Sequence, residues 1–341
     1  MKYFENYENL DSDMQGVVEQ LIKFNAPPLE TLDFANARAT PTFKNAVEEM
    51  GSNSTTTRAA NVVMPAMPEP VEKVLHIRIP TRDGEVLARV YYPGDDRNLP
   101  VIVYFHGGGW VIANLDVYES SCRALCNAAE AIVVSVNYRQ APEAKFPAAV
   151  NDAYDATQWV LQNASEIGGD ASRVAIAGES AGGNMATVTC IQAKDKGGLM
   201  PVAQLLVYPV TDTSMSQPSY AENQDTIPLH TSMMPWFMKY YLEDESDKTN
   251  KYVAPLHADD LSGLPPAIVI TAEFDPLRDE GEQYAKKLAD SGVSVKFQRF
   301  EGVVHEFFGL AGAVSKAADA VEFAADGLKE VFELKRKGRT V

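Results

Sequence analysis

The sequence contains few cysteines, and their number is odd. Three cysteines occur among 341 residues, at positions 122, 126 and 190. So sparse a set is a poor basis for a disulfide framework and fits a reducing compartment, so we expect the protein in the cytoplasm. Cys122 and Cys126 are one helical turn apart, which could suggest metal ligands, but no histidine or further cysteine accompanies them at zinc spacing. We therefore interpret them as buried apolar side chains.

The sequence also lacks a long apolar run and an excess of positive charge. No segment approaches the roughly 20 apolar residues of a membrane span, and residues 1–5 show no continuous apolar segment typical of a secretory signal. Acidic residues outnumber basic ones by 47 to 30, for a formal net charge of -17. This balance argues against nucleic acid or an anionic membrane surface as a partner. We expect a soluble protein without stable membrane insertion.

Apolar residues make up 45% of the chain, enough for a sizeable core. From about residue 74 they fall into short strand-like runs, at residues 74–79, 86–92, 101–105, 132–136, 174–177, 205–208 and 267–270. Several runs are continuously apolar, as in strands buried on both faces of a parallel sheet. Segments of helical length separate many of them, such as 118–130, 148–163 and 181–194. This alternation predicts an α/β fold with a mostly parallel sheet flanked by helices.

One long interval breaks the alternation. Almost 60 residues separate the strand that ends near Pro209 from the one that starts near Ala267, which is too long for a loop without structure of its own. We interpret most of this interval as helices of a cap. It contains four large apolar side chains that either form the core of the cap, which we favour, or contact substrate: Met233, Met234, Trp236 and Phe237.

Residues 178–182, Gly-Glu-Ser-Ala-Gly, form a G-x-S-x-G element. An apolar run leads into it and a helical pattern leaves it, so Ser180 is expected on a sharp strand–turn–helix connection that exposes its hydroxyl above the sheet. The N-terminus of the helix would favour developing negative charge there. Since the pentapeptide alone is a weak signal, the alternative is a strand–helix turn with an inert serine.

A second glycine-rich element, His-Gly-Gly-Gly-Trp at residues 106–110, follows the strand-like run 101–105. Three successive glycines free the backbone to turn its N–H groups toward one point, where they and the N–H of Ala181 can hold a tetrahedral oxyanion. A phosphate-binding loop is the alternative, but the run lacks both the G-x-G-x-x-G spacing and a Walker lysine. We interpret His106 as an anchor of the loop rather than a base.

A serine nucleophile needs a base to take its proton and a carboxylate to fix the tautomer of that base. Asp275 and His305 each follow a late strand, in the order Ser, Asp, His that this arrangement requires. His257 precedes Asp275 and would reverse the order. Asp279 and Glu280 are rival carboxylates, although Asp279 is expected to cap the next helix. The predicted triad is therefore Ser180, Asp275 and His305.

These motifs, with Tyr-Arg-Gln-Ala-Pro-Glu at 138–143 and Asp-Pro-Leu-Arg-Asp-Glu-Gly at 275–281, resemble the hormone-sensitive-lipase-like esterases, which are family IV of the bacterial lipolytic enzymes. The likeness runs from about residue 70 to 330, and the combination of the two glycine motifs is specific. Two departures occur: Glu179 stands where Asp is common, and Gln140 where Leu is common.

The resemblance implies an α/β-hydrolase fold with a helical cap, built from residues 1–65 and 211–258, over a catalytic core of residues 66–210 and 259–341. It also implies that the oxyanion donors are the N–H groups of Gly108, Gly109 and Ala181. The resemblance further implies that no metal or organic cofactor is used.

The sequence thus predicts a serine carboxylesterase that acts on small-molecule esters with short- to medium-length acyl chains. The alternatives are a long-chain lipase, a peptidase on the same fold and a catalytically silent binding protein. Apolar and polar residues alternate over 293–298, which indicates a strand near the edge of the sheet. Such an edge invites pairing with a second copy to give a homodimer, although Lys296 could block it.

Overall fold

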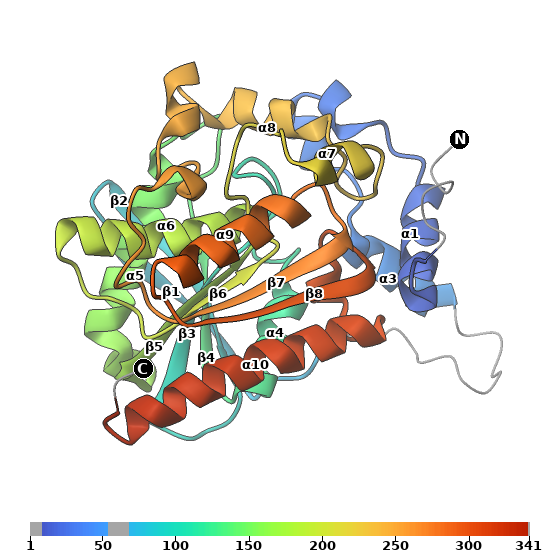
Figure 1. Cartoon of the computed structure of the whole chain (residues 1–341). Helices are drawn as coiled ribbons and strands as arrows, with labels where there is room; N and C mark the ends of the chain where they lie inside the picture. The colour runs from blue at the N-terminus through green and yellow to red at the C-terminus, as the bar shows by residue number, and fades with distance from the viewer. Residues whose placement is uncertain (1–8, 54–67, 340–341) are drawn as a thin grey trace.

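The structure, a computed structural model, describes residues 9–53 and 68–339 (Figure 1). Part of the N-terminal region predicted to belong to the cap therefore lies outside the described residues. The α-helices are α1 (Ser12–Lys23), α2 (Phe34–Ala37), α3 (Phe43–Asn53), α4 (Glu119–Ala129), α5 (Ala148–Asn163), α6 (Ala181–Lys196), α7 (Pro218–Glu222), α8 (Met233–Tyr241), α9 (Arg278–Asp290) and α10 (Ser315–Arg336). The shorter 3-10 helices are η1 (Leu29–Thr31), η3 (Ala164–Ile167), η4 (Glu245–Thr249), η5 (Pro255–His257) and η6 (Phe307–Leu310).

Eight strands form a single sheet. They are β1 (Lys73–Thr81), β2 (Gly84–Tyr92), β3 (Leu99–Phe105), β4 (Ile132–Asn137), β5 (Gly169–Glu179), β6 (Gln204–Val207), β7 (Ala267–Phe274) and β8 (Val295–Val304), in the spatial order β1-β2-β4-β3-β5-β6-β7-β8. β2 pairs antiparallel with both of its neighbours, and the remaining pairs are parallel. Each predicted strand-like run overlaps a strand, and β8 lies at the sheet edge as the alternation predicted. The α/β prediction is confirmed.

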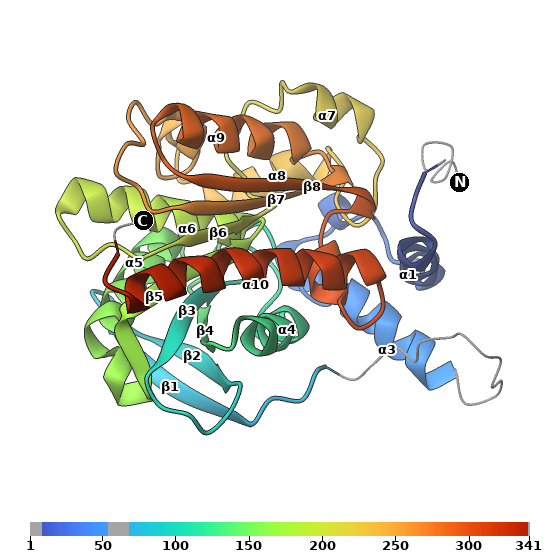
Figure 2. The same ribbon diagram turned by 60° about the horizontal axis from the view of Figure 1, so that its bottom comes forward.

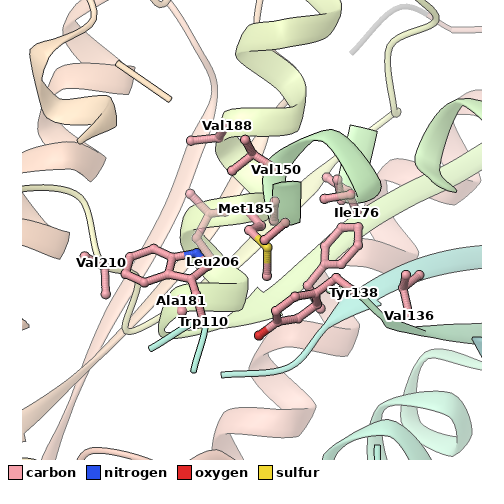
Figure 3. Packing of buried hydrophobic residues seen from close by; sticks show 14 of the residues in the cluster. Trp110, Val136, Tyr138, Val150, Ile176, Ala181, Met185, Val188, Leu206 and Val210 are labelled. Carbon is pink, nitrogen blue, oxygen red and sulfur yellow. The ribbon is translucent and has the colours of Figure 1, made fainter. Parts of the chain in front are cut away.

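Helices cover both faces of this sheet, and each face has its own apolar core. Helices α4 and α10 pack together on one face, while α5, α6 and α9 lie on the other (Figures 1 and 2). In the second core Met185 and Val188 of α6 pack with Ile176 of β5 and Val150 of α5 (Figure 3). Fully burying one such side chain stabilises the fold by about 1.5–3 kcal/mol. Coverage on both sides explains why the central strands read as continuous apolar runs.

Helix α1, the first among the described residues, packs against one of the two apolar cores. Asp11 is the N-cap residue of α1, and its carboxylate accepts hydrogen bonds from the N–H groups of Asp13 and Met14. Its buried face, which includes Val17 and Val18, belongs to the same apolar core as α4 and α10. Among the described residues, no helix is both long enough and apolar enough to cross a membrane.

Short helices from two distant parts of the chain meet at one end of the sheet. The indole Nε1 of Trp236 in α8 donates to the carbonyl oxygen of Leu32, between η1 and α2, at 2.9 Å. The ring of Phe34 meets that of Tyr240 edge-on, with centroids 5.8 Å apart. The two regions predicted to form a cap are therefore in contact, and the exact domain boundaries stay a prediction.

Candidate active site

The loops that carry the predicted catalytic residues all leave the sheet at the same edge. Ser180 follows β5, Asp275 follows β7 and His305 follows β8, while the glycine-rich segment follows β3. These four strands are parallel, so their carboxyl ends meet. Residues far apart in the sequence are thereby collected at one point above the sheet.

The three side chains predicted for the triad lie in one hydrogen-bonded row. Nδ1 of His305 lies 2.7 Å from Oδ2 of Asp275, and Nε2 lies 3.0 Å from Oγ of Ser180. The N–H of Leu277 donates to Oδ1 of Asp275 at 2.8 Å, so both carboxylate oxygens have partners. With Nδ1 donating to the aspartate, Nε2 presents its lone pair to the serine hydroxyl. A histidine in this state can take the serine proton.

The turn at Ser180 is strained, and the glycines around it leave the space it needs. Ser180 has φ 58° and ψ -119°, a conformation that costs a non-glycine residue on the order of 1–3 kcal/mol. A Cβ on Gly178 would lie 2.2 Å from the carbonyl oxygen of Gly182, and one on Gly182 would lie 1.9 Å from that of Phe105. Any side chain at either position would therefore push the turn out of place.

Opposing influences act on the imidazole of His305. Its burial by itself lowers the pKa, but the adjacent Asp275 carboxylate raises it, and the charges of Glu306 and Glu179 act in the same direction. The net result is a pKa above the ordinary value. The imidazolium that forms when His305 accepts a proton is therefore stabilised by negative charge.

His106 has a different environment. Its Nδ1 lies 2.8 Å from the carbonyl oxygen of Gly107, and its ring stacks on Tyr138 with centroids 4.4 Å apart. Burial lowers its pKa to about 4, against the raising effect of the Gly107 carbonyl. A neutral, stacked ring in the core fits the expected anchoring role.

The glycine-rich loop is folded back on itself at the candidate oxyanion position. Gly108 and Gly109 have φ +96° and +56°, and the carbonyl oxygen of Gly108 accepts from Ile112. Nε2 of Gln140, one of the two departures from the family pattern, donates to the carbonyl oxygen of Ile112 at 2.7 Å and so supports the loop. Within the described chain, the N–H groups of Gly108, Gly109 and Ala181 donate to no protein acceptor. They are available to a ligand.

Ser180 and His305 open on a cavity of about 120 Å³. Its lining includes Gly108 and Gly109 of the glycine-rich loop and Met233, Met234 and Phe237 of helix α8. The contact with α8 is close, because a Cβ on Gly109 would lie 2.2 Å from the ring of Phe237.

Trp236, the fourth of the predicted substrate contacts, is placed elsewhere. Trp236 is not among the described residues that line the small cavity. Its ring packs edge-on against Phe237 and Tyr240 while its Nε1 bonds to Leu32. Trp236 is thus part of the cap core, the alternative that the sequence had favoured for this group.

A larger cavity of about 410 Å³ lies beside the first. Its walls include Phe43 of α3, Tyr118 at the start of α4, and Leu310 of η6. Thr42, Val117 and Glu306 line both cavities, so the two adjoin at these residues. The sequence analysis did not identify Glu306 as a site residue. Its position directly after His305 is the feature of the sequence that could have indicated it.

Glu179, the second departure from the family pattern, is buried beneath the nucleophile turn. Its carboxylate accepts hydrogen bonds from the hydroxyls of Tyr104 and Tyr208. Burial raises its pKa above the ordinary value, and the two hydroxyls oppose that shift. Neither tyrosine was predicted to have a role, because nothing in a linear pattern shows that two strands bring their hydroxyls to one carboxylate.

The rival carboxylates form hydrogen bonds with residues other than His305. Asp279 accepts from the N–H of Ser219 at 2.8 Å. It lies in the first turn of α9, for which Leu277 is the N-cap residue, so the expectation that Asp279 caps the helix is wrong. Glu280 accepts from the N–H groups of Thr211 and Asp212 at 2.6 and 3.1 Å.

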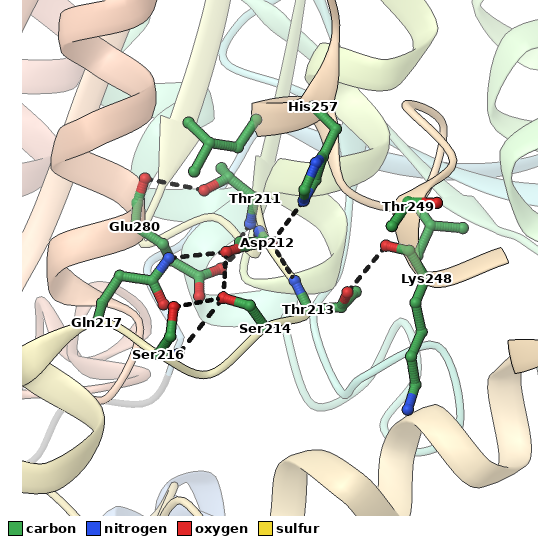
Figure 4. Close-up of polar contacts among 12 residues, drawn as sticks. Thr211, Asp212, Thr213, Ser214, Ser216, Gln217, Lys248, Thr249, His257 and Glu280 are labelled. Atoms are coloured by element: carbon green, nitrogen blue, oxygen red, sulfur yellow. Dashed lines mark hydrogen bonds and ion pairs between the residues drawn. The ribbon is translucent and has the colours of Figure 1, made fainter. Parts of the chain in front are cut away.

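Glu280 belongs to a polar cluster where the chain leaves β6 for the predicted cap (Figure 4). Nε2 of His257 lies 3.0 Å from Oδ1 of Asp212, and Ser214 and Gln217 donate to the other oxygen. Burial alone would raise the pKa of Asp212, but its hydrogen-bond donors lower it to about 2. His257 is therefore paired with Asp212. This agrees with the expectation, drawn from its position before Asp275 in the sequence, that His257 is not the base of the triad.

We next consider disulfides and metal binding. Cys122, Cys126 and Cys190 are buried and not in disulfides. In the part of the chain that the structure describes, no three histidine, cysteine or acidic side chains gather in a way that could hold a metal ion.

The chain is similar in sequence to proteins of known activity. Residues 102–309 match the family model described as alpha/beta hydrolase fold. The chain is 45% identical over 274 residues to the carboxylesterase NlhH of Mycobacterium tuberculosis, covering 77% of this chain and 86% of that one. It is 39% identical over 242 residues to an arylesterase of Saccharolobus solfataricus, covering 71% and 79%.

A solved structure gives the same result at the level of the fold. The hyperthermophilic esterase of the archaeon Pyrobaculum calidifontis superimposes with a TM-score of 0.84 at 38% identity, covering 94% of this chain and 98% of that one. The sequence motifs, the sheet order and these relatives lead to one assignment. The chain belongs to the hormone-sensitive-lipase-like family of carboxylesterases, within the α/β-hydrolase fold.

Proposed function

We propose that this protein hydrolyses carboxylic esters with short- to medium-length acyl chains through a covalent acyl-enzyme intermediate on Ser180. His305 serves as the general base and Asp275 orients it. The observation that carries the proposal is the continuous hydrogen-bonded row from Asp275 through His305 to Ser180. Its distances are those at which a proton can pass from hydroxyl to imidazole.

In the acylation step, Oγ of Ser180 attacks the ester carbonyl carbon while Nε2 of His305 takes the hydroxyl proton. The carbonyl oxygen becomes an oxyanion, which accepts hydrogen bonds from the N–H groups of Gly108, Gly109 and Ala181. Losing one donor from such a site typically costs about 10²–10³ in rate. The carbon–oxygen bond to the alcohol then breaks, and His305 gives its proton to the leaving oxygen.

Deacylation repeats these steps with water. His305 takes a proton from a water molecule, whose oxygen attacks the acyl carbon. The bond to Ser180 breaks, and the proton returns to the serine oxygen, so the free acid leaves and the enzyme is regenerated. Every proton transfer in this scheme passes through Nε2 of His305.

The smaller cavity supports the preference for short acyl chains. At about 120 Å³ it has room for roughly four water-sized groups. The side chains of Met233, Met234 and Phe237 line it, and we propose them as the contacts of the acyl chain. Methionine is flexible, so this lining can adapt to a somewhat longer chain.

We further propose that the chain forms a homodimer through β8. This strand is at the sheet edge, and Phe297 on it is 42% exposed, one of the few large apolar side chains with that much exposure among the described residues. Nζ of Lys296 lies 3.4 Å from the carbonyl oxygen of Phe323 on α10, so this lysine is directed toward the helix layer. That removes the main objection to pairing at this edge.

Replacing the proposed nucleophile tests the catalytic proposal directly. Ser180→Ala is expected to abolish turnover of p-nitrophenyl butyrate, because no acyl-enzyme can form. In the parent protein, an organophosphonate should label Ser180 in a one-to-one ratio, as read by mass spectrometry of peptides. Labelling of a different serine, or turnover by the alanine variant, would remove Ser180 from the mechanism.

A further inference from the structure

Glu306 directly follows the proposed base and faces both cavities of the site. Its backbone lies in the left-handed region, with φ +64°. The hydroxyl of Tyr118 donates to its Oε1 at 3.0 Å. One oxygen of the carboxylate is therefore held in place at the junction between the small cavity that contains Ser180 and the larger one beside it.

No described residue neutralises this carboxylate. Over residues 9–53 and 68–339, Glu306 forms no ion pair with a lysine or arginine, although two such cations line the cavities. Arg38 is paired with Glu143 at 2.6 Å, and Lys44 is paired with Glu48. A negative charge with an unused oxygen therefore faces the space that a substrate would occupy.

The proposed mechanism determines which half of the ester lies beside this charge. The leaving oxygen must come within reach of Nε2 of His305 to receive its proton. The acyl carbon lies between Ser180 and the N–H groups of the glycine-rich loop. This loop and helix α8 both line the small cavity, so the acyl half occupies that cavity. The alcohol half therefore extends past His305 toward the larger cavity, and Glu306 stands at the entrance to that cavity.

The larger cavity suits a cation that carries apolar substituents. Most of its exposed lining surface is apolar, from side chains such as Phe43, Val47 and Leu310, and the ring of Tyr118 also lines it. Its other charged lining residues are mostly acidic: Glu48, Glu69 and Glu179, with Lys44 paired to Glu48. Aromatic rings favour a quaternary ammonium group, whose charge is spread over methyl groups. Its volume of about 410 Å³ exceeds that of the acyl cavity, so it accommodates a branched head group.

We propose that Glu306 is a specificity-determining residue that favours esters of cationic amino alcohols over neutral and anionic esters. Its carboxylate pairs with a positive charge on the alcohol half while the acyl half occupies the smaller cavity. This inference rests on the proposed function, since it takes the ester to be cleaved at Ser180.

Two esters of the same shape and different charge test this pairing. Choline butyrate and 3,3-dimethylbutyl butyrate differ in a quaternary nitrogen in place of a carbon. We would measure kcat/KM for both esters, in the parent protein and in Glu306→Gln. For each protein, the value for the choline ester is divided by the value for the neutral ester. Differences in intrinsic reactivity cancel when the two proteins are compared. We expect the ratio to fall about tenfold in Glu306→Gln, equivalent to about 1.4 kcal/mol.

Charge reversal and a control variant make the test specific. In Glu306→Lys the ratio should fall further, and the butyrate ester of 3-hydroxypropanoate, which carries a carboxylate, should become a better substrate than in the parent. Glu166→Gln removes the same charge from an exposed position in η3, beside the amino end of β5 and away from the site. Its ratio should equal that of the parent.

The two proposals fail in different ways. If Glu306→Gln is folded by circular dichroism, hydrolyses the neutral ester and keeps the parent ratio, the role of Glu306 is refuted while the esterase mechanism stands. If Glu306→Gln does not fold, an unchanged ratio in Glu306→Lys refutes it equally. If Ser180→Ala still cleaves the neutral ester, the proposed function itself is wrong.

Discussion

The aromatic ring of Tyr208 packs against the imidazole of His305, with ring centroids 4.5 Å apart. The hydroxyl of the same tyrosine donates to Glu179, the residue before Ser180. One side chain therefore touches the proposed base and is hydrogen-bonded to the turn that carries the proposed nucleophile. A glutamate in place of the more common aspartate does not interrupt this link, since its carboxylate is buried and reaches two tyrosine hydroxyls.

Asp275→Asn is expected to lower kcat for p-nitrophenyl butyrate by about 10⁴ without unfolding the protein. The amide retains an oxygen for the N–H of Leu277, but it stabilises the imidazole tautomer that cannot take the serine proton. Asp279→Asn is the matched control, because Asp279 bonds to Ser219 instead of the histidine. A folded Asp279→Asn that loses more activity than Asp275→Asn would show that the wrong carboxylate had been assigned.

Variants of α8 should separate substrate contacts from cap core. Phe237→Ala widens the small cavity, so the preferred acyl chain of p-nitrophenyl esters should lengthen by about two carbons. Trp236→Ala should instead lower thermal stability with little change in that preference, since replacing a buried tryptophan costs about 3–5 kcal/mol. Activity on p-nitrophenyl esters from C2 to C12 measures the chain-length preference, and a thermal melt of each variant measures its stability. A chain-length shift in Trp236→Ala alone would contradict the assignment.

The buried Glu280 should make stability depend on pH. Burial raises its pKa to about 8, against hydrogen bonds from Tyr220, Thr211 and Asp212 that lower it. Because the folded-state pKa lies above that of the unfolded chain, its contribution is fully present below about pH 4.3 and is lost as the pH rises through about 8. Denaturant unfolding of the parent from about pH 5 to about pH 9 should therefore show a decline that Glu280→Gln reduces.

The exposed Glu322 on α10 offers a control for this titration. Glu322→Gln removes one ionisable carboxyl from the surface and should leave the pH dependence of the unfolding free energy as it is in the parent. Equal slopes in the parent, Glu280→Gln and Glu322→Gln would mean that Glu280 is ionised in the fold across this range.

Light scattering at micromolar concentration should give twice the mass of one chain. Phe297→Asp places like charges opposite one another at a β8–β8 contact and should produce a monomer. Turnover should be retained, because Ser180, Asp275 and His305 come from one chain. A dimer that survives this substitution would place the interface elsewhere, and a monomeric parent would exclude it.

The sequence was sufficient for features set by neighbouring residues. The turn at Ser180 could be predicted because strand, glycines and helix are contiguous, and Asp275 and His305 because each follows a strand. Tyr118 and Glu306 are different, since 188 positions separate them and their hydrogen bond depends on how α4 meets the end of β8. Trp236 and Phe237 also needed the structure, because consecutive helical residues differ by about 100° in direction.

The contact between Gly109 and Phe237 joins the glycine-rich loop of the candidate active site to helix α8 of the predicted cap. A methyl group at position 109 would overlap the Phe237 ring, with atoms 2.2 Å apart. Phe237 thus adds a steric limit at position 109 to the strain that any side chain would meet there at φ +56°. A mutant library built to broaden the ester range should therefore vary position 237 and keep glycine at 109.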